Sequence, residues 1–191
     1  MSVLYIYAHP LEQSLHGAIK NRAREVLRDG VDFLDLNAEG FDPVLSARDR
    51  ELYHDEERNI EAVAPYVERL RQASTWIVQF PTWNFGPPAI LKGFLDRVFV
   101  PGIAFDLSEP SRTKPLMTHL RRVVGIVTYG QPRHVAWWMG DPPRKLIKRH
   151  LVWHSGGRAR ADYHALYHVN ALDRQGGQAF IDRVARALEQ L

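Results

Sequence analysis

The fold is decided near the start of the chain, by the stretch SVLYIYAHPLEQSLHGAIKNRAREVLRDGVDFLDL (residues 2–36). Its first seven residues are apolar, β-branched or aromatic, which is typical of a strand buried on both faces of a sheet. Apolar residues then recur at helical spacing between Ser14, a candidate N-cap, and Gly30, a candidate C-cap. A second apolar run at residues 31–36 completes a strand–helix–strand unit, which requires parallel strands joined by a right-handed crossover.

The rest of the chain continues this alternation. The patterns predict strands at residues 74–80, 121–130 and 159–169, and helices at residues 89–99, 141–156 and 173–191. Residues 37–72 predict one or two helices interrupted near Pro65. Strands that alternate with helices favour an open α/β sheet. Because the first of five strands lies at the N-terminus, we expect one flavodoxin-like domain over residues 1–191, with parallel strands in the order 2-1-3-4-5 and helices on both faces.

Composition excludes several classes of protein. Of the 191 residues 45 % are hydrophobic and 25 % charged, as in an ordinary globular domain, and the net charge of +3 is spread without a long run of one sign. A nucleic-acid-binding arm is therefore not indicated. The absence of cysteine excludes disulfides, thiolate catalysis and cysteine metal sites, and no metal site is expected. With neither a signal peptide nor a membrane-length apolar run, we expect a cytoplasmic protein without membrane insertion.

Function is expected in three loops, at residues 9–14, 81–88 and 128–134, because ligands of such sheets bind beyond the carboxyl ends of the strands. The first loop leads into a helix N-terminus, which favours a phosphate, and Ser14 and His16 add side-chain donors. It lacks the glycines of a Walker A loop or a dinucleotide-binding loop. The alternative is that Ser14 only caps the helix.

The second loop offers Trp83 and Phe85 to a planar ring, unless both aromatics simply pack into the core. In the third loop, Gly130 permits a close approach of the backbone to a ligand. A flavin mononucleotide has both matching parts, a phosphate and a planar ring. A bound flavin would also explain why the sequence shows neither a nucleophile triad nor a metal cluster.

Three motifs carry a family resemblance: YAHPLEQSLHGAI (residues 7–19), FPTWNFGPPAILKGFLDRVF (residues 80–99) and TYGQP (residues 128–132). They resemble the flavodoxin-like NAD(P)H:quinone oxidoreductases, a group that includes flavin-dependent azoreductases and the ancillary oxidoreductases of bacterial potassium-efflux systems. The resemblance implies a flavin site whose phosphate is held by His9, Ser14, Leu15 and His16. It places the ring and ribityl chain on Pro81, Thr82, Trp83, Asn84 and Phe85, and the pyrimidine edge on Thr128, Tyr129 and Gly130. It points to Tyr129 and His134 as catalytic candidates that steady charge on the reduced flavin. His16 departs from the pattern, since several relatives have Asn there.

The resemblance also implies a reaction. NAD(P)H would reduce the flavin, and a quinone or another flat acceptor would then take two electrons. The pair Asn84–Phe85 favours FMN, with FAD as the alternative, and leaves NADH against NADPH open. Family members are homodimers, so Trp137, Trp138 and Met139 are expected to line the substrate slot or the dimer contact. The alternatives are a flavoprotein regulatory subunit of a membrane transporter, a flavodoxin-type electron carrier and a flavin-free binding module.

Overall fold

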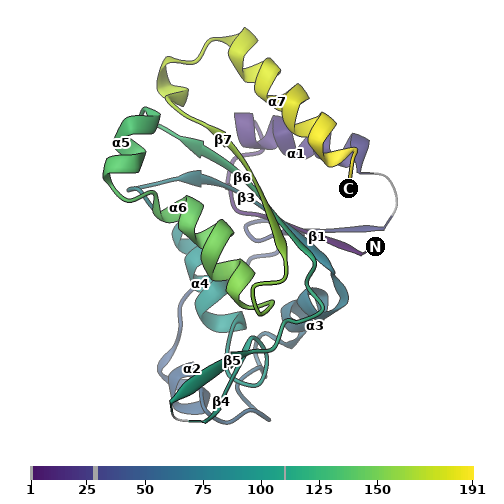
Figure 1. Cartoon of the computed structure of the whole chain (residues 1–191), viewed down its shortest axis with the longest axis vertical. Helices are drawn as coiled ribbons and strands as arrows, with labels where there is room; N and C mark the ends of the chain where they lie inside the picture. Colours follow the sequence, from purple (N-terminus) through teal and green to yellow (C-terminus); the bar gives the residue numbers. More distant parts are fainter. Residues whose placement is uncertain (1, 28–29, 110) are drawn as a thin grey trace.

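Five parallel strands form the central sheet, in the order β2-β1-β3-β6-β7, of a computed structural model that describes residues 2–27, 30–109 and 111–191 (Figure 1). The strands are β1 (Val3–Tyr7), β2 (Val31–Asp35), β3 (Thr75–Thr82), β6 (Arg122–Tyr129) and β7 (Arg160–Leu166). The predicted order is confirmed, because these are the five strands of the sequence analysis in the expected arrangement. The order reverses beside β1, so the carboxyl ends of β1, β3 and β6 lie next to one another.

Helices cover both faces of the sheet (Figure 1). One face packs against α1 (Leu15–Val26) and α7 (Arg174–Leu188). The other packs against α3 (Ala64–Gln72), α4 (Ala89–Val98), α6 (Pro142–Lys145) and the π-helical segment η1 (Leu146–Leu151). Side chains alternate along each strand: Tyr5 and Ile77 face the first layer, whereas Leu4 and Trp76 face the second. The central strands are therefore apolar along their whole length.

The predicted C-cap of the first helix is wrong. α1 ends at Val26, and the backbone N–H of Leu27 closes its last turn on the carbonyl of Ala23. Leu27, with φ −86° and ψ 53°, leaves the helical conformation there, and its side chain is buried in the core. Gly30 has a φ of +96° and belongs to the turn that leads into β2, where its positive φ suits glycine.

Pro65 also plays a different part from the one predicted. It lies in the first turn of α3, where its missing N–H costs nothing, so it begins a helix instead of interrupting one. The break lies earlier, between α3 and α2 (Ala47–Leu52), whose start is closed by a capping box of Ser46 and Asp49.

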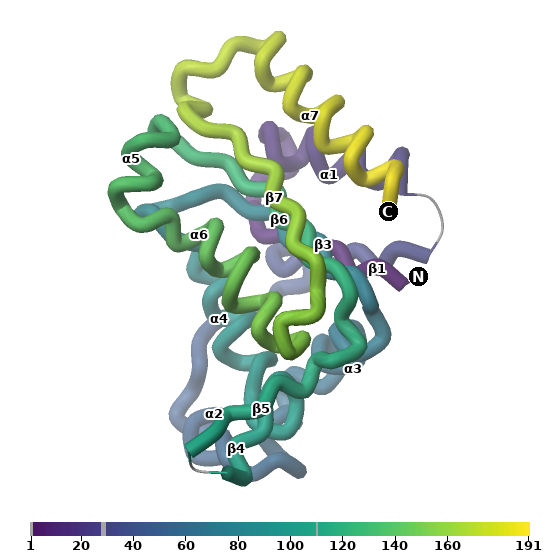
Figure 2. Tube along the Cα trace, in the orientation of Figure 1, coloured from purple at the N-terminus to yellow at the C-terminus, as the bar shows by residue number. Residues whose placement is uncertain are grey.

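Four elements of the described residues were not predicted. A hairpin of β4 (Phe105–Glu109) and β5 (Arg112–Pro115) follows α4, α5 (Arg133–Trp138) follows β6, and the short 3-10 helix η2 (Val169–Ala171) follows β7. The hairpin lies at the same end of the molecule as α2 (Figure 2). A hydrogen bond of 2.9 Å joins the Asn59 side chain, in the segment after α2, to the carbonyl of Pro101, in the segment before β4. Among the described residues, no helix has both the length and the apolar character needed to cross a membrane.

Candidate functional site

Residues from all three predicted loops meet at the carboxyl ends of β1, β3 and β6. The rings of His9 and His16 stack with centroids 5.2 Å apart, and the ring of Trp83 lies 5.9 Å from that of His9. His16 in turn places its Nε2 atom 2.8 Å from Thr128 Oγ1. One side-chain cluster therefore joins the first, second and third loops.

The first loop presents an open helix N-terminus. Ser14 is the N-cap, and its hydroxyl accepts a 3.0 Å hydrogen bond from the Gly17 amide while donating to the Leu11 carbonyl at 2.7 Å. The amides of Leu15 and His16 belong to the first turn, where intrahelical bonds do not use the N–H groups. These amides and the positive end of the helix dipole suit an anion such as a phosphate.

A compact clamp holds this loop against α1. A side chain on Gly17 would place its Cβ 1.8 Å from the Glu12 carbonyl oxygen, so only glycine fits. The buried Lys20 amine bonds the carboxylates of Glu12 at 2.6 Å and Asp35 at 2.9 Å. Burial opposes the charge on Lys20, but the bonds to both carboxylates outweigh it and raise the pKa of Lys20. The loop is therefore preformed.

The second loop is a strained turn. Trp83 and Gly86 exchange two backbone hydrogen bonds of 3.0 Å, and the residues between them, Asn84 and Phe85, have φ values of +48° and +62°. Two consecutive positive φ angles define a tight hairpin turn that favours Asn and Gly, so a bulky Phe there is strained. The Trp83 ring is 48 % exposed and is not part of the core. Strain of this kind at a loop tip is common where a ligand is gripped.

Thr82 adds an unsatisfied polar group to the same loop. Its hydroxyl oxygen is buried and has no hydrogen-bond partner within the described ranges. Buried hydroxyls normally have partners, so a ligand atom at this position would satisfy it. Pro81, the residue before it, is buried in β3.

The third loop holds its tyrosine inward. The Tyr129 hydroxyl donates to Asp141 Oδ1 at 2.6 Å and bonds the Tyr163 hydroxyl, and its ring stacks on Tyr167 at 4.5 Å. Burial, followed by the nearby Tyr163 and Asp141, raises the pKa of Tyr129, so the hydroxyl stays protonated. His134 lies exposed on α5. The two catalytic candidates thus occupy different environments. Gly130 lies close to Asn170, and a Cβ on this glycine would come within 3.2 Å of the Asn170 amide nitrogen.

His16 is buried and its ring is fully engaged. Its Nε2 atom bonds Thr128, and its Nδ1 atom lies 3.0 Å from the amide nitrogen of Gln79. Burial, with a smaller contribution from His9, lowers the pKa of His16 to about 3, so the ring is neutral. Both ring nitrogens therefore bond protein groups, and the backbone amide of His16 is the group left for the predicted phosphate contact. Gln79 was not predicted as a site residue, although it is the one polar residue in the apolar stretch at residues 76–80.

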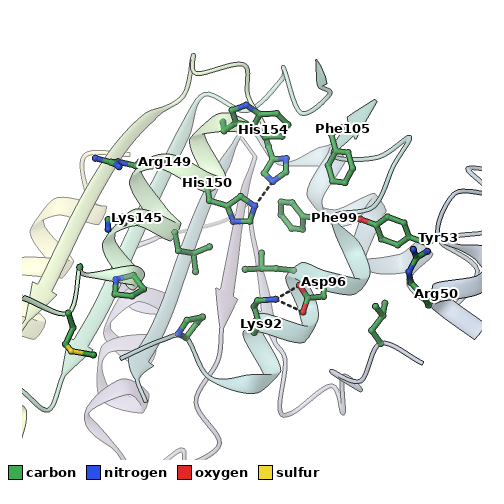
Figure 3. Close-up of a pocket in the computed structure, with 18 residues that line it drawn as sticks. Arg50, Tyr53, Lys92, Asp96, Phe99, Phe105, Lys145, Arg149, His150 and His154 are labelled. Atoms are coloured by element: carbon green, nitrogen blue, oxygen red, sulfur yellow. Dashed lines mark hydrogen bonds and ion pairs between the residues drawn. The ribbon is translucent and has the colours of Figure 1, made fainter. Parts of the chain in front are cut away.

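A separate groove of about 990 Å³ lies beside the second loop (Figure 3). Its walls come from α2, α4, α6 and η1, and it meets the second loop at Pro87. His150 and His154 point toward one another there, with their Nε2 atoms 3.2 Å apart, beside the ring of Phe99 (Figure 3). The residues predicted to hold a flavin line the loop ends and not this groove, so the groove is available for another purpose.

The cluster of loops has the donors that an FMN molecule needs. The first loop supplies amides for a phosphate, and the second supplies a turn with exposed aromatic surface and the unsatisfied Thr82 hydroxyl. The residues present therefore fit the group that the sequence predicts.

Known proteins resemble the chain over most of its length. A family model described as a flavodoxin-like fold matches residues 1–158. Ribosyldihydronicotinamide dehydrogenase (quinone) of Pongo abelii is 35 % identical over 124 residues, which cover 55 % of this chain and 54 % of that protein. The FMN-dependent NADH:quinone oxidoreductase of Lachnoclostridium phytofermentans is 30 % identical over 122 residues, covering 62 % and 61 %. The crystal structure of Smu.1420 from Streptococcus mutans superposes with a TM-score of 0.84 at 26 % identity, over 100 % of both chains. The chain spans about half the length of the first of these relatives.

Proposed function

Because the chain belongs to the family with the flavodoxin-like fold, we propose that it is an FMN-dependent oxidoreductase that passes two electrons from NAD(P)H to a quinone-like acceptor. One observation carries the proposal: the open N-terminus of α1, the strained turn at Asn84–Phe85 and the Thr128 hydroxyl converge at one edge of the sheet. The two similar enzymes from Pongo abelii and Lachnoclostridium phytofermentans carry the names of quinone oxidoreductases, which supports the same activity for this chain.

Bound FMN would supply the chemistry, since a flavin accepts a hydride and gives up two electrons. The protein's residues bind and orient it. The amides of Leu15 and His16, with Ser14 and His9 beside them, would hold the phosphate. The turn at Asn84–Phe85, beside Trp83, would hold the ring with its backbone N–H groups and exposed aromatic surface, and Pro81 and Thr82 would complete that wall.

The third loop would hold the pyrimidine edge of the ring. Thr128 and the backbone of Tyr129 and Gly130 would donate hydrogen bonds there, which would stabilise negative charge on that edge. Tyr129 would act by holding the loop, because its hydroxyl is committed to Asp141. The exposed His134 remains the other candidate for steadying charge on the reduced flavin.

We also propose a homodimer that uses the groove beside the second loop. Trp137 and Trp138 on α5 are 76 % and 78 % exposed, and Met139 and Trp153 line the groove. Adjacent exposed aromatics next to an apolar groove are typical of a protein interface. A second copy there would lie next to the flavin site at Pro87. Sedimentation equilibrium tests this: a monomer at micromolar concentration that keeps full activity would contradict the homodimer.

The decisive experiment identifies the cofactor and the reaction. The purified protein is heated, and the released flavin is separated to distinguish FMN from FAD. NADH and NADPH oxidation is then followed with a panel of quinones. We expect FMN and quinone-dependent oxidation. A colourless protein that takes up neither flavin would refute the proposal, and oxidation only in the presence of a separate reductase would favour the electron carrier. Fractionation of the source cells would test the predicted cytoplasmic location.

A further inference from the structure

Four buried side chains form a continuous hydrogen-bonded chain beneath the third loop. They come from three strands and α1, and in order they are Tyr5, Gln79, His16 and Thr128. Tyr5 and Gln79 are fully buried, and His16 and Thr128 are 3 % and 5 % exposed. This series of hydrogen bonds thus runs from the core of the sheet to the carboxyl ends of the strands, where the three loops meet.

The direction of the chain is fixed at Gln79. The amide nitrogen of Gln79 lies 2.8 Å from the backbone carbonyl of His16, and a carbonyl can only accept a hydrogen bond. The nitrogen must therefore point toward His16. The amide oxygen then faces the Tyr5 hydroxyl, which donates to it. The reverse orientation of the amide would set two carbonyl oxygens against each other.

The orientation of Gln79 decides the tautomer of His16. The same amide nitrogen lies 3.0 Å from His16 Nδ1, so Nδ1 accepts a hydrogen bond and carries no proton. A neutral imidazole has one proton, which must then be on Nε2. The Nε2–H donates to Thr128 Oγ1 at 2.8 Å. Because the Thr128 oxygen accepts this bond, its own hydroxyl proton is directed elsewhere.

We propose that Tyr5, Gln79 and His16 are positioning residues that keep the Thr128 hydroxyl as a hydrogen-bond donor to an acceptor atom of the bound flavin. The inference rests on the proposed function, since it assigns a hydrogen-bond direction, from Thr128 to the flavin, within the same site. The pyrimidine edge of a flavin carries acceptor atoms and gains negative charge on reduction. A donor held there by a buried chain stabilises the reduced form, because no reorganisation is needed when the charge appears.

The tautomer can be measured in the flavin-free protein. Nitrogen-15 chemical shifts of the imidazole rings distinguish an Nδ1–H from an Nε2–H histidine. We expect the Nε2–H form for His16 near neutral pH, and loss of that fixed form in Gln79→Met. An Nδ1–H ring or a charged ring in the unmodified protein would overturn the inference, whether or not the protein binds FMN.

A double-mutant cycle tests whether Gln79 acts through Thr128. The cycle compares Thr128→Val, Gln79→Met and the double variant by FMN titration and by the midpoint potential of the bound flavin. Losing one hydrogen bond should weaken FMN binding roughly 5- to 30-fold in each single variant. The double variant should bind FMN no more weakly than Thr128→Val does. The midpoint potential of the bound flavin should become more negative in all three variants. Effects that multiply instead would overturn the inference.

Three further variants complete the design. Thr128→Ser keeps the hydroxyl and should restore binding, whereas Gln72→Met removes an exposed glutamine bonded to Glu68 and should change nothing. Tyr5→Phe keeps the ring that stacks on Phe33 and should give a smaller loss in the same direction, which covers the case that Gln79→Met does not fold. If the unmodified protein binds no flavin at all, the proposed function fails. The tautomer measurement then still shows whether the hydrogen bonds from Tyr5 to Thr128 have the proposed direction.

Discussion

His16 and Thr128 join the first helix to the end of β6 through a 2.8 Å hydrogen bond between Nε2 and Oγ1. The two residues are 112 positions apart in the sequence, and both are buried. The first loop and the third loop are therefore held in register by the protein itself. Binding to a preformed site needs little ordering of side chains, which favours affinity.

The cap of α1 separates stability from binding. Ser14→Ala should destabilise the protein by about 1 kcal/mol, because it removes the hydrogen bond to the Gly17 amide. It should also weaken FMN binding, because the cap orders the first turn. Ser46→Ala is the matched control, since Ser46 caps α2 away from the loops. Urea denaturation and FMN titration should show loss of stability in both variants and loss of affinity only in Ser14→Ala. Equal affinity in the two variants would remove Ser14 from the site.

Gly17 should tolerate no side chain. Gly17→Ala forces a Cβ to within 1.8 Å of the Glu12 carbonyl oxygen, so the loop must move and FMN binding should fall at least tenfold. Gly177→Ala is the control, because Gly177 is buried in α7 and its nearest neighbour would be 3.7 Å from the new Cβ. That change should be neutral or stabilising by up to about 1 kcal/mol. Binding of FMN by Gly17→Ala with unchanged affinity would show that the loop is not clamped.

The strained turn should show a trade-off between stability and binding. Phe85→Gly relieves the positive φ and should stabilise the flavin-free protein by about 1 kcal/mol. The same change removes the aromatic side chain and should weaken FMN binding. Phe85→Ala keeps the strain and loses the ring, so it should weaken binding without the gain in stability. Thermal melts of the flavin-free variants, together with FMN titrations, check both effects. A Phe85→Gly variant that binds FMN as tightly as the unmodified protein would mean that the ring is not a contact.

Acid should destabilise the protein through His16. Its pKa is about 3 in the folded chain and about 6.5 in the unfolded chain, so between these values the unfolded state binds more protons. Stability therefore rises with pH across this window and is lost as pH falls below about 6.5. At pH 5 the loss is about 2 kcal/mol relative to neutral pH. Urea unfolding at pH 7 and pH 5 measures this difference. His16→Gln should reduce this difference in the free energy of unfolding by about that amount. Part of the difference should remain, because burial also lowers the pKa of His154, to about 4. If the difference between pH 7 and pH 5 were unchanged in His16→Gln, another group would be responsible for the loss of stability in acid.

Most of the fold was predictable because buried parallel strands leave a direct record in the sequence. The apolar runs at residues 2–8 and 74–80 are strands because both faces of β1 and β3 are covered by helices. Local signals failed where tertiary packing decided. Gly30 resembles a helix cap, but α1 already ends at Val26, and Leu27 after it packs into the core. The hairpin of β4 and β5 has weak strand signals, since its side chains are mostly exposed.

The sequence by itself determined which segments form the five strands and where the three loops lie, because residue periodicity and turn chemistry are local properties. Only the tertiary structure decided what each polar side chain does there. The Tyr129 hydroxyl turns inward to Asp141, and both ring nitrogens of His16 bond Gln79 and Thr128, partners that residue type alone does not predict. A hydrogen bond depends on the distance and direction between atoms far apart in the chain, and a linear pattern carries neither quantity.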